Sequence, residues 1–450
     1  MHLARMEGLP SILIRANLPP PGGTAEVVQH GVTCHVPSPS EDPVQQKYNR
    51  RWNRCCKTKP ALAKRGKWPY HRPSGASCST RSLVALSPCF WNGPEPMRTI
   101  LVTGTAGFIG FHLATLLLSE GFRVVGFDGM TDYYDIRIKQ RRHQMLLQNP
   151  NFTCVEGMLE DLDTLHRLVA DTKPSVIVHL AAQAGVRYSL ENPRAYMSAN
   201  VMGTFNVMEC AREFGVDHLL MASTSSVYGG NDVMPFNETE RTETQLTLYA
   251  ATKKANENMG HCYAHLWKIP TTMFRFFTVY GPWGRPDLAL FKFVKAALQG
   301  EPIDVYNHGN MARDFTYVTD LVRGIRLLID TPPVEPANRA DILPGDSLSP
   351  VAPFRVVNIG NGTMVQLLDF ITEIERSLNL PIRKNLMDMQ KGDVPATWAN
   401  SDLLHRLTGY RPETSVAEGV RRFVDWYRDY YNVTDADLDR LRQRAGDGRG

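Results

Sequence analysis

The chain has 450 residues, of which 43% are hydrophobic and 21% charged, and its formal net charge is +4. This length allows two domains with a sizeable core. No apolar run reaches the roughly eighteen residues of a membrane-spanning helix, so the sequence predicts no membrane partner.

The first 97 residues differ in composition from the rest of the chain. They contain 13 Lys and Arg against 5 Asp and Glu, a balance of +8 that leaves −4 for residues 98–450, and 13 of the 30 prolines. This composition lacks sustained apolar periodicity and favours disorder, and the initial apolar run is too short for a signal peptide. We therefore expect residues 1–97 to be a disordered extension or a non-native leader, with Met97 as the physiological start. Sequencing of the native N-terminus tests this expectation.

Cysteine usage points to a reducing compartment. The adjacent Cys55 and Cys56 lack zinc-site spacing, and the isolated basic run around them is typical of a solvated segment, so we expect neither a metal nor a nucleic-acid partner. Beyond the leader, Cys154, Cys210 and Cys262 lie far apart in apolar settings. That distribution fits the reduced thiols of a cytoplasmic protein.

A compact strand-helix-strand pattern begins after Met97. A β-branched run at Ile100–Thr103 predicts a strand, residues 112–120 predict a helix, and Arg123–Phe127 predicts a second strand. The GxxGxxG glycines between the first strand and the helix are Gly104, Gly107 and Gly110. They permit a tight turn with a pyrophosphate at the helix N-terminus. Asp128, which ends the second strand, is placed to bind an adenosine ribose and favours NAD over NADP.

A glycine-rich turn without a ligand is the alternative interpretation of that motif. The alternation of strands and helices that follows favours the dinucleotide fold. Ser175–Ala184 predicts a buried strand followed by small residues that let a flat cofactor approach, and residues 200–215 predict an amphipathic helix. The predicted fold class is α/β, a Rossmann doubly wound parallel sheet with a smaller C-terminal α/β substrate-binding domain.

A run of hydroxyl residues ends the next predicted strand, His218–Gly229. Thr224, Ser225 and Ser226 lie towards its carboxyl end, where open α/β sheets bind ligands. No acidic residue stands among them. This position favours a ligand site over an ordinary surface turn.

Tyr249 and Lys253 stand four residues apart in a predicted helix, so both side chains project from one face. A free tyrosine has a pKa of about 10 and is a poor base at neutral pH. A neighbouring ammonium and a nicotinium charge would stabilise its phenolate and make it a usable proton acceptor. A YxxxK pair often serves packing alone, but behind a dinucleotide fingerprint it predicts a reactive pair.

From about Met97 to Tyr431 the chain resembles the extended short-chain dehydrogenase/reductase superfamily, and within it the UDP-glucuronate 4-epimerases. The segments that carry this resemblance are TGTAGFIGFHLA, TDYYD, HLAAQAGVRYS, YAATK, FRFFTVYGPWGRPD, RDFTYVTD and GDVPATWA. It implies an isomerase that uses NAD as a tightly bound group regenerated in each cycle. It also implies a UDP-sugar uronate as substrate and a homodimer formed by the helices near YxxxK.

The resemblance assigns roles to the reactive residues. Tyr249 would take the proton from the sugar 4-hydroxyl while the C4 hydride passes to NAD, Thr224 would hydrogen-bond the same oxygen, and Lys253 would hold the nicotinamide ribose. The 4-keto sugar would then turn over and receive the hydride on its other face. The implied cofactor contacts are Gly104, Gly107, Phe108, Ile109, Gly110, Asp128, Leu180, Ala181, Ala182, Asn200, Tyr249 and Lys253.

The resemblance also explains the missing acid. Related 4,6-dehydratases carry an Asp-Glu pair at this strand end, and uronate decarboxylases carry Glu in place of Ser226. Ser225 and Ser226 would instead hold the substrate carboxylate without adding negative charge beside it, together with Thr278 and Arg285.

Three further residues are expected to bind the nucleotide part of the substrate. Arg313 resembles the arginine that clamps the diphosphate, and Asp393 resembles a contact to the uridine ribose. Arg187 lies near the site, where a phosphate contact and a structural ion pair are equally consistent interpretations.

The predicted organisation has an NAD-binding Rossmann domain at 98–275 and a mainly nucleotide-sugar-binding domain at 276–432, some segments of which could return to the sheet. Residues 433–450 are predicted to form a frayed tail. Two departures from the family pattern are Gly129, where Asn usually follows the ribose-binding acid, and Met158, where many members have Asp. We expect both to lower the occupancy of co-purified NAD, which absorbance after acid release would measure.

Three other functions remain open from the sequence. UDP-glucuronate decarboxylation would use the same first oxidation, as would another nucleotide-sugar epimerase or dehydratase. A non-catalytic NAD-binding regulator is the non-enzyme alternative, against which the intact Tyr249, Lys253 and Thr224 argue. A role in supplying precursors for polysaccharide biosynthesis is expected for the epimerase.

Overall fold

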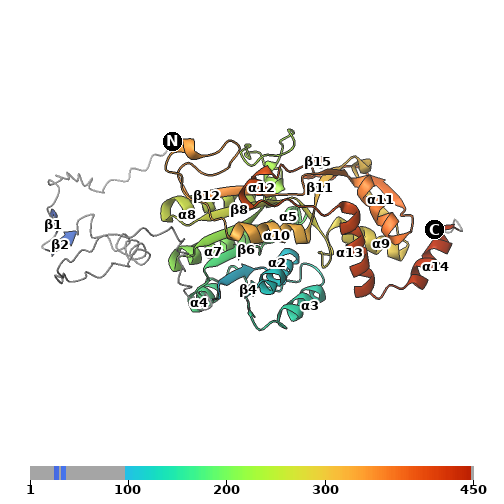
Figure 1. The fold of residues 1–450 in the computed structure, drawn as a ribbon, viewed down its shortest axis with the longest axis horizontal. Helices are drawn as coiled ribbons and strands as arrows, with labels where there is room; N and C mark the ends of the chain where they lie inside the picture. The colour runs from blue at the N-terminus through green and yellow to red at the C-terminus, as the bar shows by residue number, and fades with distance from the viewer. Residues whose placement is uncertain (1–24, 30–31, 37–96, 447–450) are drawn as a thin grey trace, which may run out of the picture. The chain divides into compact units, whose positions relative to one another are not determined.

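The computed structural model describes residues 25–29, 32–36 and 97–446 (Figure 1). The chain divides into two compact units, Met1–Cys89 and Phe90–Gly450. In the first unit, β1 (Ala25–Gln29) and β2 (Val32–Val36) pair as antiparallel strands. The rest of the predicted leader, including Cys55 and Cys56, lies outside the described residues.

A parallel seven-stranded sheet forms the centre of the second unit (Figure 1). In spatial order its strands are β12 (Phe354–Ile359), β8 (Thr271–Phe276), β7 (His218–Thr224), β6 (Val176–His179), β3 (Thr99–Thr103), β4 (Arg123–Asp128) and β5 (Phe152–Glu156). The order reverses between β3 and β6, which is where open α/β sheets bind ligands at the carboxyl ends of their strands. This architecture confirms the predicted doubly wound parallel sheet.

Helices cover both faces of the sheet because its strands are apolar on both sides. Ile100 and Val102 of β3 pack on one face and Leu101 on the other, each fully buried. The first face carries α2 (Phe108–Ser119), α10 (Val318–Ile329) and α12 (Asp402–Thr408). The opposite face carries α4 (Leu162–Thr172), α7 (Gly203–Phe214) and α8 (Leu248–Trp267).

A further hydrophobic cluster of the described residues, separate from the two that cover the sheet, packs five helices against short strands. Its helices are α3 (Ile136–Leu146), α9 (Ala289–Gln299), α11 (Leu367–Leu378), α13 (Val416–Tyr430) and α14 (Asp435–Gly446). The associated strands are β9 (Thr278–Tyr280), β10 (Ile303–Tyr306), β11 (Ala312–Tyr317), β13 (Met364–Gln366), β14 (Lys384–Met387) and β15 (Ala396–Thr397). β11 lies between β13 and β15 and also pairs with β9, while β10 pairs with β14.

Three predicted elements differ from those observed. The helix predicted at 112–120 begins at Phe108, because the glycine turn leads directly into it. The helix predicted over 200–215 opens with a π-helical segment, η2 (Met197–Met202), before α7. The predicted frayed tail is wrong for α14, whose Leu438 is 2% exposed in the further hydrophobic cluster.

None of the helices among the described residues combines the length and the apolar character that crossing a membrane requires.

Candidate active site

Three cavities meet at the carboxyl ends of the central strands. The first, of about 530 Å³, extends over the ends of β3, β4 and β6. The second, of about 340 Å³, lies over the end of β7, and the third, of about 520 Å³, lies beside α9. Tyr249 lines the first two cavities, and Arg285 lines all three. The cavities therefore form one site around these two side chains.

The glycine turn after β3 shapes the floor of the first cavity. Gly104 has a φ of +80°, and a Cβ on Gly110 would lie 2.0 Å from the Gly104 carbonyl oxygen, so the turn requires glycine at both positions. Gly107, Phe108 and Ile109 line the cavity at the start of α2. Free backbone N–H groups at a helix N-terminus bind phosphate, so this cradle fits the pyrophosphate of a dinucleotide.

Asp128 lines the same cavity at the end of β4. Its carboxylate accepts hydrogen bonds from the backbone N–H groups of Ala106 and Met130, both at 2.9 Å. These two donors fix its orientation and leave lone pairs for a ribose hydroxyl. The acid is therefore placed as the sequence predicts for an adenosine ribose.

The predicted cofactor residues after β6 differ in whether they line the first cavity. Leu180, Ala181 and Ala182 line it. Asn200 does not line the cavity, because its side chain is fully buried beneath the residues that do. Its Oδ1 accepts a hydrogen bond from the Gln183 backbone N–H at 2.8 Å. The predicted direct contact from Asn200 is thus replaced by an indirect one, since Gln183 itself lines the cavity.

The predicted reactive pair projects from the first turns of α8. The Thr247 side chain caps this helix by accepting from the Ala250 N–H at 3.3 Å. Lys253 is 3% exposed, its Nζ donates to the Ala222 carbonyl at 3.0 Å, and burial lowers its pKa to about 8. The ammonium is therefore held against the end of β7, beside the wall of the first cavity.

Burial raises the pKa of Tyr249, as expected for a phenol shielded from water. Two groups oppose this increase, a hydrogen bond with Thr224 and the positive charge of Arg285. The sequence pointed instead to the Lys253 ammonium as the group that stabilises the phenolate. Arg285 supplies that charge here, from a segment 36 residues further along the chain.

The hydroxyl run does not continue the strand to Gly229 as predicted. β7 ends at Thr224, and Ser225–Tyr228 form a short 3-10 helix, η3. Thr224 Oγ1 accepts from the Ser226 N–H at 3.2 Å and caps η3. The second cavity is lined by the residues predicted to bind the carboxylate, Ser225, Ser226, Thr278 and Arg285, and by Thr224, which is predicted to bind the sugar 4-oxygen.

Arg285 is held by a neighbour that the sequence reasoning missed. Its Nε and Nη2 donate to the two carboxylate oxygens of Asp287 at 2.9 and 2.7 Å. Burial lowers the pKa of Arg285, but the hydrogen bonds and charge of Asp287 outweigh it and raise that pKa overall. The spacing of Arg285 and Asp287 by two residues in GRPD was the available signal.

The residues predicted to bind the nucleotide lie at the junction of the second and third cavities. Arg313 lines the second, Arg187 the third, and Asp393 both. Arg187 donates to Asp393 Oδ2 at 3.1 Å, and its guanidinium lies 4.7 Å from the centre of the Tyr306 ring. Arg187 thus forms an ion pair with Asp393, and its side chain also lines the third cavity.

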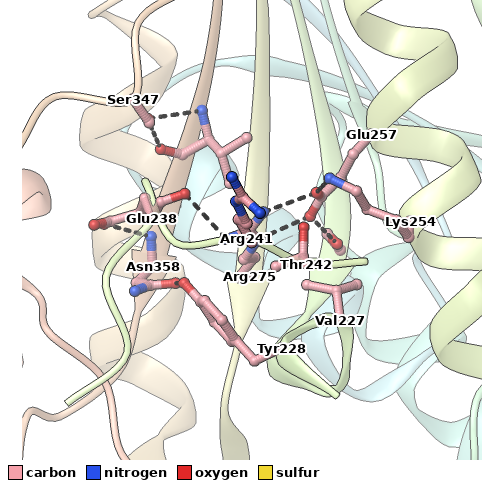
Figure 2. Close-up of polar contacts among 12 residues, drawn as sticks. Val227, Tyr228, Glu238, Arg241, Thr242, Lys254, Glu257, Arg275, Ser347 and Asn358 are labelled. Carbon is pink, nitrogen blue, oxygen red and sulfur yellow. Dashed lines mark hydrogen bonds and ion pairs between the residues drawn. The ribbon is translucent and has the colours of Figure 1, made fainter. Parts of the chain in front are cut away.

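A buried polar network supports the strand end from behind (Figure 2). Glu257 of α8 is 2% exposed, accepts from Ser223 Oγ at 2.7 Å, and pairs with both Nε and Nη2 of Arg275 at 2.9 Å. The Arg275 guanidinium lies 4.7 Å from the centre of the Tyr228 ring in η3. The network therefore connects α8, β8 and η3.

The network continues from Tyr228 to the edge strand of the sheet. Tyr228 OH donates to Asn358 Oδ1 at 2.7 Å, and the Asn358 backbone N–H donates to Glu238 Oε1 at 2.9 Å (Figure 2). Glu238 is 7% exposed, and burial raises its pKa to about 7. This network was not predicted from the sequence, although Glu257 repeats the four-residue spacing of Tyr249 and Lys253.

No group of three or more His, Cys, Asp or Glu side chains that could hold a metal ion occurs in the part of the chain that the structure describes.

Comparison with known proteins identifies relatives over the same residues. The profile described as the NAD dependent epimerase/dehydratase family matches residues 100–340. A Rhizobium meliloti (strain 1021) protein described as a probable UDP-glucuronate 4-epimerase is 56% identical over 331 residues, 74% of this chain and 97% of that protein. Protein CapI of Staphylococcus aureus is 52% identical over 334 residues, 74% of this chain and 99% of that protein.

A solved structure is similar over the same share of the chain. The UDP-glucuronic acid 4-epimerase from Bacillus cereus, in complex with UDP-glucuronic acid and NAD, superposes with a TM-score of 0.66 at 31% identity. The match covers 74% of this chain and 100% of that one.

Proposed function

This chain belongs to the NAD-dependent epimerase/dehydratase family, and from that premise we propose that it interconverts UDP-glucuronate and UDP-galacturonate through a 4-keto sugar. The observation that carries the substrate assignment is the second cavity. It is lined by hydroxyl groups, by Tyr249 and by two arginines, Arg285 and Arg313, and Asp393 is the only acidic residue among the described residues that line it. A uronate carboxylate finds donors there and little repulsion.

NAD is the cofactor, and the first cavity fits it. The glycine cradle at the start of α2 holds the pyrophosphate, and Asp128 holds the adenosine ribose. When bound, NAD would supply a reversible hydride acceptor for C4 of the sugar, which is chemistry that the side chains cannot supply.

The side chains move and hold the proton. Tyr249 takes the proton of the sugar 4-hydroxyl, and its hydrogen-bonding partner Thr224 orients the same oxygen. Arg285 favours the phenolate form of Tyr249 through its charge and holds the substrate carboxylate through the donors that Asp287 leaves free. Lys253, fixed on the Ala222 carbonyl, binds the nicotinamide ribose. In the second half of the cycle, Tyr249 returns the proton to the 4-keto oxygen, while C4 would receive the hydride on its opposite face.

A direct test is incubation of the purified protein with UDP-glucuronate, followed by NMR of the products. We expect the reaction to reach an equilibrium mixture of UDP-galacturonate and UDP-glucuronate without an excess of added NAD. Tyr249→Phe should lower turnover by about 10²- to 10⁴-fold and leave binding of UDP-glucuronate intact. Turnover of no nucleotide sugar at all would favour the non-catalytic regulator.

Oxidative decarboxylation is the second candidate, because it begins with the same 4-keto sugar. A pentose product or trapped carbon dioxide as the main product would replace the epimerase assignment. The hydroxyl side chain of Ser226, at the position where the resemblance gives decarboxylases a glutamate, favours the epimerase.

We also propose that the protein is a cytoplasmic homodimer that supplies precursors for polysaccharide biosynthesis. Large apolar side chains on η2, α7 and α8 support an interface near the reactive pair: Met202 is 53%, Phe205 39% and Leu266 62% exposed. Free thiols at Cys154, Cys210 and Cys262 fit a reducing compartment. Sedimentation analysis of the purified protein tests the dimer.

A further inference from the structure

The adenine end of the first cavity lies between the ends of β4 and β5. These strands are parallel neighbours, with Asp128 opposite Glu156. In folds of this type the acid at the end of the second strand binds the ribose, so the base lies beyond it. The segment that follows β5, residues 157–160, lines the cavity there, together with Gly129.

An apolar side chain occupies part of this end. Met158 is 45% exposed and lines the cavity. Its thioether lies where a side chain on residue 129 would begin, because a Cβ on Gly129 would be 2.5 Å from Met158 Sδ. A thioether packs well against a ring face but does not select the polar edge of a base.

Glu160 provides the polar group that Met158 lacks. It lines the same cavity, and its Oε2 is buried with no hydrogen-bond partner among the described residues. The next residue, Asp161, is already used, since its side chain caps α4 by accepting from the Thr164 N–H at 3.1 Å. A buried carboxylate oxygen without a donor is costly, so its natural complement is a ligand that donates a hydrogen bond.

Adenine offers one such donor on this edge. Its exocyclic 6-amino group donates, whereas its ring nitrogens accept and would repel a carboxylate. We propose that Glu160 accepts a hydrogen bond from the adenine 6-amino group and thereby makes the protein selective for adenine dinucleotides, while Met158 packs on the ring. Replacing the amino group by an oxo group would place two acceptors against each other.

The test compares NAD with nicotinamide hypoxanthine dinucleotide, which has an oxo group in place of the 6-amino group and a proton on the neighbouring N1. Titration calorimetry of nucleotide-free protein gives both dissociation constants. We expect the unaltered protein to bind NAD at least about tenfold more tightly than the hypoxanthine analogue. In Glu160→Gln, whose amide can donate to the oxo group, the ratio should fall to about threefold or less, or invert.

Glu156→Gln is the matched control. Glu156 is exposed at the end of the same strand and does not line the cavity, so the variant should keep the preference for NAD. Equal binding of both dinucleotides by the unaltered protein would overturn the proposal. An unchanged ratio in Glu160→Gln would also overturn it and would assign the preference to the backbone or to another residue.

The inference rests on the use of NAD and not on the identity of the sugar. The two proposals therefore fail separately: a missing base preference leaves epimerisation intact, and a different sugar product leaves the binding ratio intact.

Discussion

Ser226 is the residue at which the sequence resemblance predicts the difference between an epimerase and a decarboxylase. Its backbone N–H donates to Thr224 Oγ1, which fixes the backbone there. Its side chain lines the second cavity, as does that of Arg285. Ser226→Glu would bring a carboxylate into the space of the substrate carboxylate. Because like charges in contact cost several kcal/mol, we expect epimerisation to fall by about 10²-fold or more.

The products distinguish repulsion from a general loss of structure. We expect the residual turnover of Ser226→Glu to release a larger share of carbon dioxide, measured by trapping and by NMR of the nucleotide sugars. Ser226→Ala should remain an epimerase, with a KM about tenfold higher from the lost hydrogen bond. Unaltered epimerisation in Ser226→Glu would remove the carboxylate role from this residue.

Gly129 and Met158 depart from the family pattern together, and the structure connects them. A side chain at residue 129 must displace the Met158 thioether, which lies 2.5 Å from the position of its Cβ. We expect Gly129→Asn to weaken NAD binding about tenfold by moving Met158 within the cofactor cavity. The fold should survive, because the displaced group is the end of a flexible side chain.

A double-mutant cycle separates this coupling from a direct effect of asparagine. In Gly129→Asn combined with Met158→Ala, NAD affinity by calorimetry should lie within about threefold of that of Met158→Ala alone. Additive losses would show that the two positions act independently. The lower NAD occupancy expected from either departure stays a prediction, which acid release from the purified protein would measure.

Residues in short motifs could be located from the sequence, and their partners could not. The roles of Gly104, Asp128 and Tyr249 could be predicted from their spacing to neighbouring motif residues, because a helix or a tight turn fixes nearby residues relative to one another. Asp287 and Glu257 depend instead on which groups burial forces into contact. No local pattern reveals that requirement.

The same distinction holds for elements. Apolar strands that alternate with helices along the sequence predicted the parallel sheet, since both faces of such a sheet must be buried. The π-helical opening of the helix at 200–215 was not predictable, because the apolar periodicity of the segment is that of an ordinary α-helix. The end of β7 at Thr224 was likewise decided by a side-chain cap, which turns the chain into η3.

The network that joins β8, α8, η3 and β12 contains a carboxyl group whose protonation should affect stability (Figure 2). Burial raises the pKa of Glu238 from 4.5 to about 7. The folded protein therefore binds this proton more tightly than the unfolded chain does. The resulting contribution to the free energy of unfolding is complete below pH 4.5 and is lost as the pH rises through 7.

Glu238→Gln removes this dependence while its side-chain oxygen can still accept from the Asn358 N–H. Relative to the unaltered protein, the variant should gain about 2–3 kcal/mol in free energy of unfolding between pH 4.5 and pH 8. Urea denaturation across this range measures the difference. Parallel pH profiles for the two proteins would show that Glu238 titrates normally.

At the scale of the whole molecule, the described residues that line the three cavities lie between Gly104 and Thr397. The Rhizobium meliloti relative matches 331 residues, which are 97% of its own length but 74% of this chain. Both observations support a catalytic site formed by residues of the second unit.

A chain that begins at Met97 should therefore keep the activity of the full chain. We expect its kcat/KM for UDP-glucuronate to lie within about twofold of the full-length value and its thermal midpoint to be unchanged, because the described cores of the second unit draw on no residue before Ile100. A chain that begins at Gly104 is the matched comparison, since it lacks the central strand β3 and should not fold. A large loss of activity in the Met97 chain, with its fold intact by circular dichroism, would instead assign the leader a part in catalysis.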